Sequence, residues 1–305
     1  MKKTLTLLLL LAGATCYAQK TKLQLNLQQD STYYLTTNSN LTITETIQGQ
    51  PFVVNMIASG KAAHKVTAIK DTTYEMTVQF EKLVLHMDLA GRVMDMDSEN
   101  DGQDIFSKIM KAMLHKAIII IISKNGKVLD LKNTDNLNSG IFEKFPDLPE
   151  EKKAQIKAQL QNSFGPEYFK TGFQDAFAMF TQNEIGINDT WTATTKIKAF
   201  AMANVKTTYI MQAITNKTCK VHGDAVISSS GSSEYGQING MPTRMDNIIG
   251  TTAADYTLDK ATGWIIEAKV VKTIKGDAKI KDNPKVPGGM EFPIAMTADF
   301  TMVNK

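Results

Sequence analysis

Two stretches that lie about half the chain apart share one pattern: TAIKDTTYEM at residues 67–76 and QAITNKTCKV at residues 212–221. Each reads Ala-Ile, then three polar residues typical of a turn, then Thr and a return to alternating apolar and polar residues. A β-hairpin is therefore predicted at each place. The recurrence raises the question of whether the chain contains two related β regions.

Two further pairs of segments recur in the same order along the chain. ISKNGKVLDL at residues 122–131 resembles LDKATGWIIEA at 258–268, and DSTYYLT from Asp30 resembles NDTWTAT from Asn188. Common order and similar spacing predict an internal duplication. The alternative is that unrelated hairpins look alike, because Asn, Asp, Gly and Lys populate turns in most proteins.

Most of the chain alternates between apolar and polar residues, as strands with one buried face do. The last such segment places Phe292, Ile294, Met296, Ala298, Phe300 and Met302 on one face, and a shorter one places Leu23, Leu25 and Leu27 on one face. The alternation from Tyr74 changes parity near Glu81, which predicts a bulge there. Pro293 favours an edge position or the start of a strand.

Three helices are predicted between the two β regions. The first follows Asp101 or Asp104 as its N-cap, and the second begins within residues 147–151 and ends near Gly165. The third begins at Pro166. Its apolar stripe consists of Phe169, Phe173, Phe177 and Phe180.

The predicted fold is mainly β with added helices (α+β). Two related β regions form antiparallel curved sheets or a half-barrel, and about three helices are inserted between them. The expected division is a signal peptide at residues 1–18, a first β region with a short helix at 19–135, a helical linker at 136–184 and a second β region at 185–305.

The N-terminus has the pattern of a secretory signal peptide. Lys2 and Lys3 precede an apolar run over residues 5–14, and small residues stand at the −3 and −1 positions of a cleavage site between Ala18 and Gln19. The run is too short for a stable membrane span. We expect an exported protein of the periplasm or outer cell surface, without a transmembrane segment after signal removal.

Lipid attachment at Cys16 is the less favoured alternative, because Gly13 stands where a lipoprotein signal needs a Leu-like residue. Without the signal only Cys219 remains, so no intramolecular disulfide is predicted. Loss of Lys2 and Lys3 lowers the formal charge from +3 to about +1. A nearly neutral chain gives no electrostatic reason to expect nucleic acid as a partner.

Short phrases in this chain resemble a known family. These are YAQ at the signal end, IGINDTW at residues 185–191 and LDKATGWI at 258–265. They are similar to an exported β-rich family, filed as a domain of unknown function, of Bacteroidota-type bacteria. That family usually has Gly-Asp before the Trp, where this chain has Asn188, Asp189 and Thr190. The resemblance implies export and a β-rich fold, and it supplies no catalytic residues.

The predicted architecture has a more distant likeness to lipoprotein-carrier folds. Those folds shelter acyl chains between a curved sheet and helices. The likeness concerns architecture alone, and a fold does not define a function.

The residues offer little catalytic or metal-binding chemistry. Asp97, Glu99 and Asp101 alternate before a glycine as calcium ligands do, but Lys108 stands where the closing acid belongs, so a turn before a helix is favoured. The four histidines, His64, His86, His115 and His222, lack a metal-binding spacing. Cys219 is interpreted as a structural thiol. No catalytic residue, cofactor or metal is predicted, and the protein is expected not to be an enzyme.

The favoured hypothesis is a cell-envelope protein that binds a hydrophobic small molecule or a lipidated partner. Phe169, Phe173, Phe177 and Phe180 are the candidates to close an apolar pocket. The plainer interpretation is that these side chains pack a dry core. A structural or protein-interaction module without a small ligand is the alternative function, and a metal-assisted hydrolase is the third.

Overall fold

The structure is a computed structural model that describes residues 20–100, 104–198, 202–231, 234–238 and 240–305. The predicted cleavage site at Ala18 and Gln19, and the alternative acylation site at Cys16, lie outside the described residues. The first β elements are β1 (Thr21–Lys22), β2 (Thr32–Ile47), β3 (Gln50–Lys70), β4 (Thr73–Leu89), β5 (Arg92–Asp97), β6 (Ile118–Ser123), β7 (Val128–Lys132) and β8 (Glu184–Ile185). The later ones are β9 (Thr190–Lys198), β10 (Met202–Ile214), β11 (Thr218–Ser229), β12 (Gly236–Ile238), β13 (Met241–Asp259), β14 (Ile265–Ile280) and β15 (Met290–Val303).

The helices lie between β5 and β8, as predicted. They are α2 (Ile105–Met113), the 3-10 helices η1 (Thr134–Asn138) and η2 (Phe142–Lys144), α3 (Glu150–Phe164) and α4 (Pro166–Ala176). The side chain of Asp104 accepts a hydrogen bond from the backbone N–H of Ser107, so Asp104 caps α2. The other candidate cap, Asp101, lies outside the described residues.

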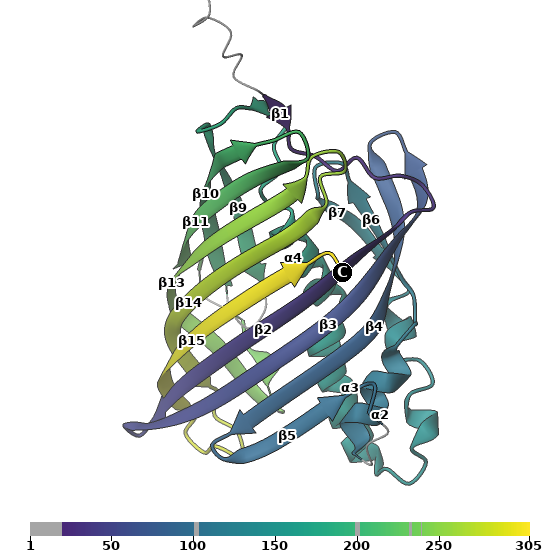
Figure 1. Ribbon diagram of the computed structural model, residues 1–305. Coiled ribbons are helices and arrows are strands. Elements are labelled where there is room, and N and C mark those ends of the chain that lie inside the picture. The colour runs from purple at the N-terminus through teal and green to yellow at the C-terminus, as the bar shows by residue number, and fades with distance from the viewer. Residues whose placement is uncertain (1–19, 101–103, 199–201, 232–233, 239) are drawn as a thin grey trace, which may run out of the picture.

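One large antiparallel sheet contains most of the strands. Along its length the order is β7-β6-β4-β3-β2-β15-β14-β13-β11-β10-β9, with β5 on β4 and β12 on β13. β2 pairs with β15, so the first and last long strands join the two predicted regions into a single sheet. Figure 1 shows this sheet curving around α4. The predicted mainly β, antiparallel and strongly curved fold is confirmed.

The two ends of this sheet are β7 and β9, which do not pair with each other. Helix α4 contacts both of them and lies on the concave side of the sheet. We call the sheet face that α4 covers the inner face. Side chains alternate between the two faces along each strand, and cross-strand partners lie on the same face. The register therefore shows which residues of every strand lie on the inner face.

The two halves of the sheet share irregularities at corresponding positions. Thr67 in the β3–β4 hairpin and Gln212 in the β10–β11 hairpin are each left unpaired one residue before the Ala-Ile pair. Leu129 in β7 and Ile266 in β14 are likewise left unpaired in the next matching hairpins. Bulges are specific local features of a strand pair. Their recurrence supports the predicted duplication, and the domain boundaries stay a prediction.

The segment with Leu23, Leu25 and Leu27 differs from its prediction. It is extended and its leucines are buried, but strand β1 ends at Lys22. The backbone N–H of Leu25 donates to the carbonyl of Lys124, 2.7 Å away, and that of Asn26 donates to the carbonyl of Thr262, 2.8 Å away. These carbonyls belong to the turns of two corresponding hairpins, so the segment crosses both turns instead of joining a ladder.

Two other sequence predictions concern single residues. The register between β3 and β4 shifts so that Glu81 is left without a partner, which confirms the predicted bulge. Pro293 pairs with Asp277 of β14, and the ladder with β2 starts only at Ile294. Pro293 is thus near the start of β15, where the missing N–H costs no bond to β2.

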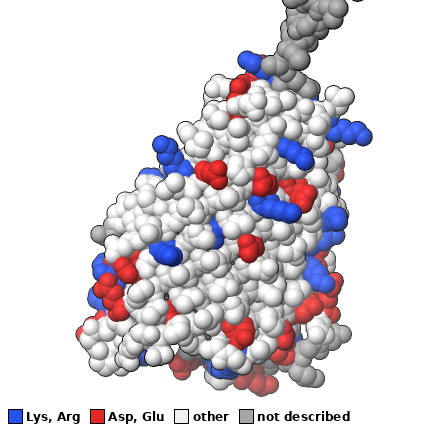
Figure 2. Space-filling view, turned by 60° about the vertical axis from the view of Figure 1, so that its left-hand side comes forward, with Lys and Arg blue, Asp and Glu red and all other residues white. Residues whose placement is uncertain are grey.

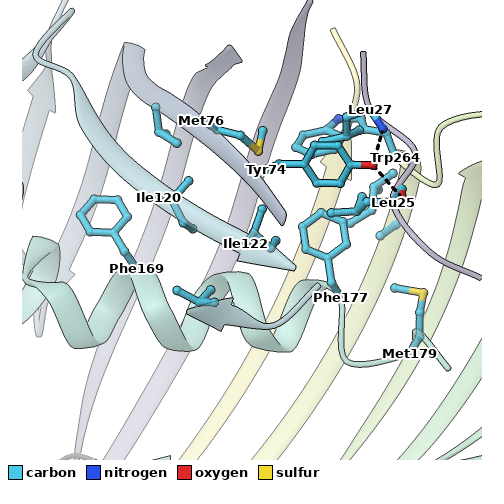
Figure 3. Close-up of a cluster of buried hydrophobic side chains, with 14 of the residues drawn as sticks. Leu25, Leu27, Tyr74, Met76, Ile120, Ile122, Phe169, Phe177, Met179 and Trp264 are labelled. Atoms are coloured by element: carbon cyan, nitrogen blue, oxygen red, sulfur yellow. Dashed lines mark hydrogen bonds between the residues drawn. The ribbon is translucent and has the colours of Figure 1, made fainter. Parts of the chain in front are cut away.

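The core under the N-terminal segment combines residues from distant parts of the chain. The hydroxyl of Tyr74 donates to the carbonyl of Leu25, 3.1 Å away, and accepts from the backbone N–H of Leu27. The fully buried Trp264 packs beside them and donates from Nε1 to the carbonyl of Tyr34. Figure 3 shows Tyr74 and Trp264 converging with Phe177, the residue directly after α4.

Gly263 is required by this arrangement. Its φ is +70°, and a Cβ there would lie 2.1 Å from the carbonyl oxygen of Gln24. Gly263→Ala should lower the free energy of unfolding by roughly 3 kcal/mol or more, because steric overlap adds to the left-handed backbone penalty of about 1–2 kcal/mol. Urea denaturation followed by circular dichroism measures the loss.

Gly49→Ala is the matched control. Gly49 has a φ of +79°, but a Cβ there would meet nothing within 4 Å. This variant should therefore show only the backbone penalty. Equal losses for the two alanine variants would contradict the role assigned to the N-terminal segment.

Candidate functional site

The four predicted phenylalanines come together along α4 and the residues that follow it. Phe169 and Phe177 are buried, whereas Phe173 and Phe180 are half-buried. The Phe169 ring lies 5.9 Å from that of Phe80 on β4, and Phe177 lies 5.6 Å from Trp264, measured between ring centroids. These are ordinary distances for packed aromatic rings.

The remaining two rings continue this packing. Phe173 lies 5.4 Å from the ring of His64 on β3, and Phe180 lies 5.4 Å from that of Phe177. The stripe therefore anchors α4 to the inner face near the turns of the hairpins (Figure 3). That these four side chains close a ligand pocket stays a prediction.

A second apolar surface lies on the inner face at the far end of the same strands. Successive cross-strand partners there are Leu41 on β2, Met56 on β3, Met87 on β4 and Met94 on β5. We call these four residues the methionine row. Met56 is six residues along β3 from Ala62, the partner of Phe80, and so lies about 20 Å from the packed stripe. All four side chains are half-buried.

The neighbouring rows extend this apolar surface. On one side lie Ile43, Val54 and Leu89, and on the other lie Ala58, Leu85 and Met96. Leu83 and Met96 are buried, whereas most of the others keep some exposure. Partly exposed, contiguous apolar side chains on one concave face are unusual in a packed core and are typical of a binding surface.

The same cross-strand row changes character on the other half of the sheet. Leu41 pairs with Ala298 on β15, which pairs with Lys272 on β14, which pairs with Thr252 on β13. The row continues through Ala225 on β11 to Thr207 on β10. The row thus has a polar end and a methionine end.

Helix α4 adds an acid above the polar end. Asp175 hydrogen bonds with the side chain of Thr195, and burial raises the pKa of its carboxyl against the attraction of the Lys272 ammonium. Burial also raises the pKa of Tyr209 to about 12 and raises that of Tyr256. Both tyrosines are buried near Asp175, so ionised forms are disfavoured throughout this region.

The outer face of the sheet has two open hollows, of about 410 and 560 Å³. Their linings include Thr44, Thr46 and Lys275 in one, and Thr208, Thr251 and Thr273 in the other. None of the four phenylalanines or the methionine row lines either hollow. Figure 2 shows that acidic and basic side chains on this side of the molecule are scattered among uncharged ones.

His64 and His222 lie in different environments. His64 is buried between Phe173 and Trp264 and donates from Nδ1 to the carbonyl of Tyr33, 3.2 Å away. His222 on the outer face binds Asp255 and Asp224, which raise the pKa of its imidazole. Within the described part of the chain, no three His, Cys, Asp or Glu side chains are placed to hold a metal ion.

The acidic stretch before α2 forms a turn. The carboxylate of Asp97 accepts from the backbone N–H of Glu99, and Glu99 pairs with Lys82 on β4. Asp101 lies outside the described residues. The thiol of Cys219 is buried, and burial raises its pKa, as in a structural cysteine.

Sequence reasoning did not find the methionine row. The alternation of apolar residues was visible in each of its strands. What could not be read from the sequence was that Leu41, Met56, Met87 and Met94 become cross-strand partners. The sequence pattern does not give the strand register that aligns these four positions.

Comparison with known proteins identifies the family. The model described as "Family of unknown function (DUF6263)" matches residues 71–265, and the chain belongs to this family. No curated protein matches the sequence.

The fold is similar to part of a solved structure entitled "Lipid-protein interactions in lipovitellin". The TM-score is 0.51 at 10% identity, over 92% of this chain and 25% of that chain. The match thus spans a quarter of that protein's length. The outer membrane protein OprG from Pseudomonas aeruginosa aligns over 92% of this chain and 100% of its own, at 6% identity and a TM-score of 0.24. Among the described helices, none has the length and apolar character needed to cross a membrane.

The buried His64 predicts a pH dependence of stability. Burial lowers the pKa of its imidazole from 6.5 to about 4, so the unfolded chain binds a proton between these values and the folded chain does not. Stability should therefore fall as pH drops from 6.5 to about 4, by up to roughly 3 kcal/mol from this residue. Urea denaturation at several pH values measures this fall.

His64→Gln should flatten the fall, whatever its effect on stability at neutral pH. His222→Gln is the control, because the raised pKa of His222 contributes stability that is present below pH 6.5 and lost as pH rises through the folded value. A pH profile unchanged by His64→Gln would contradict the assignment.

Proposed function

We propose that this chain is an exported, non-enzymatic protein of the bacterial cell envelope that binds a hydrophobic ligand or a lipidated partner on its inner face. The observation that carries the proposal is the methionine row with its apolar neighbours, which stays partly exposed on a concave surface. Methionine side chains are flexible and polarizable, so they adapt to ligands of irregular shape.

The architecture supports this function. The sheet curves around its inner face (Figure 1), and the stripe on α4 packs against one end of that face, where it contacts Phe80, His64 and Trp264. The similar solved structure is named for its lipid–protein interactions. Because that likeness concerns the fold alone, the argument for a ligand rests on the residues of this chain.

Two parts of the proposal rest on the sequence. Export follows from the signal pattern that ends at Ala18, and the absence of enzymatic activity follows from the lack of a recognisable catalytic motif. The expected location is the periplasm or the outer cell surface. A lipidated protein would place its acyl chain on the same surface as a free hydrophobic molecule.

Met56→Glu should weaken binding of the neutral apolar dye N-phenyl-1-naphthylamine by about tenfold, since a carboxylate in an apolar contact must lose its hydration. Dye fluorescence titrated with the protein measures the affinity. Retained circular dichroism would show that the variant is folded.

Ile57→Glu is the control. Ile57 is the next residue on β3, points to the outer face and is 52% exposed. Its substitution should leave the dye affinity within about twofold of the original. Failure of the original protein to bind the dye, or equal losses in both variants, would contradict binding on the inner face.

A further inference from the structure

The row that contains the methionines continues to the half-buried side chain of Lys272. Lys272 lies two strands from Leu41, with the small Ala298 between them. Ala298 is 2% exposed and points to the inner face, so its cross-strand partner Lys272 points there as well. The attraction between Lys272 and Asp175 of α4 agrees with this direction.

This ammonium has no ion-pair partner among the described residues. Asp175, the acid of α4 that acts on it electrostatically, directs its hydrogen bond to Thr195 instead. Lys272 is therefore available to an anion that enters from the inner face.

The next side chain in the row, that of Thr252, also lacks a polar partner among the described residues. The hydroxyl of Thr252, the cross-strand partner of Lys272, is buried and has no hydrogen-bond partner in the described part of the chain. Buried hydroxyls are normally paired, so this one gains a hydrogen bond if a ligand oxygen displaces the groups that cover it. A carboxylate or phosphate oxygen would accept from both groups.

We infer that the Lys272–Thr252 end of the row binds the anionic head group of an amphipathic ligand whose hydrocarbon chain lies along the methionine row. This inference rests on the proposed function, and it adds the class of ligand and the direction in which it lies. Carboxylate and phosphate heads share the required chemistry, namely negatively charged oxygen acceptors.

The dimensions of the row agree with such a ligand. From β14 to β5 the row crosses five strand spacings, which is about 24 Å at ~4.8 Å each. One hydrocarbon chain of a lipid spans about 15 Å, half the thickness of a bilayer core. Met56 lies three strand spacings from Lys272, about 14 Å at ~4.8 Å each, so a chain that starts at Lys272 reaches Met56 over Ala298 and Leu41.

The test compares probes that differ only in the head group. Hexadecanoate should bind the original protein at least tenfold more tightly than methyl hexadecanoate, measured by displacement of N-phenyl-1-naphthylamine. Lys272→Met should remove most of this preference while leaving the affinity for the ester within about twofold. Thr252→Val, which keeps the shape of the side chain, should reduce the preference by several-fold. Hexadecyl phosphate, measured in parallel, distinguishes a phosphate from a carboxylate head.

Lys269→Met is the matched control, because Lys269 lies on the same strand but on the exposed outer face. Its head-group preference should equal that of the original protein. Equal binding of acid, phosphate and ester by the original protein, or equal behaviour of the two lysine variants, would overturn the head-group site alone. Binding of no hydrocarbon probe would overturn the proposed function and this inference together.

Discussion

The constraint on which the structure depends is that a very wide antiparallel sheet must bury an apolar inner face. A twisted open sheet of more than about ten strands tends to curl or split, because the twist accumulates from strand to strand. This sheet has 13 strands in its described part and curves around α4. The helix reaches both end strands, β7 and β9, so it covers the inner face where the ends come closest.

The N-terminal segment stabilises the packing of α4 near the hairpin turns. Leu25 and Asn26 bond to the turns of two corresponding hairpins, one from each half of the sheet. Tyr74 and Trp264 then pack beneath the segment with Phe177, which directly follows α4 (Figure 3). Packing and hydrogen bonding are thus concentrated near the turns. The opposite ends of the same strands keep partly exposed apolar side chains, which is where the methionine row lies.

Sequence patterns predicted the parts of this fold that depend on local rules. Alternation marked the inner residues of the long strands, such as Phe292 through Met302. Capping rules narrowed the N-cap of α2 to Asp101 or Asp104, and Asp104 caps the helix. The N-terminal leucines also alternate, but alternation does not show which groups their backbone binds, and the prediction of a strand there was wrong. The partner of an extended segment is a long-range property.

The candidate site depended on long-range information to a greater degree. Phe169 and Phe177 were identified from helical spacing, yet the same spacing is expected of a packed core, which is where they lie. Met56, Met87 and Lys272 occur in separate strands, and only the pairing of strands places them in one row. Composition indicated that methionine was abundant, but not that Met56, Met87 and Met94 become neighbours in one row.

The two ends of the row come from different halves of the chain. Leu41, Met56, Met87 and Met94 come from the first half, and Thr252 and Lys272 come from the second, with β15 between them. Matching bulges support the predicted duplication, but two identical copies would give the same surface twice. The inner side chains differ instead. A continuous cross-strand row with an apolar end and an end that carries hydroxyl groups and a cation is the arrangement that orients an amphipathic ligand, because head and chain each find a suitable surface at one end of the row.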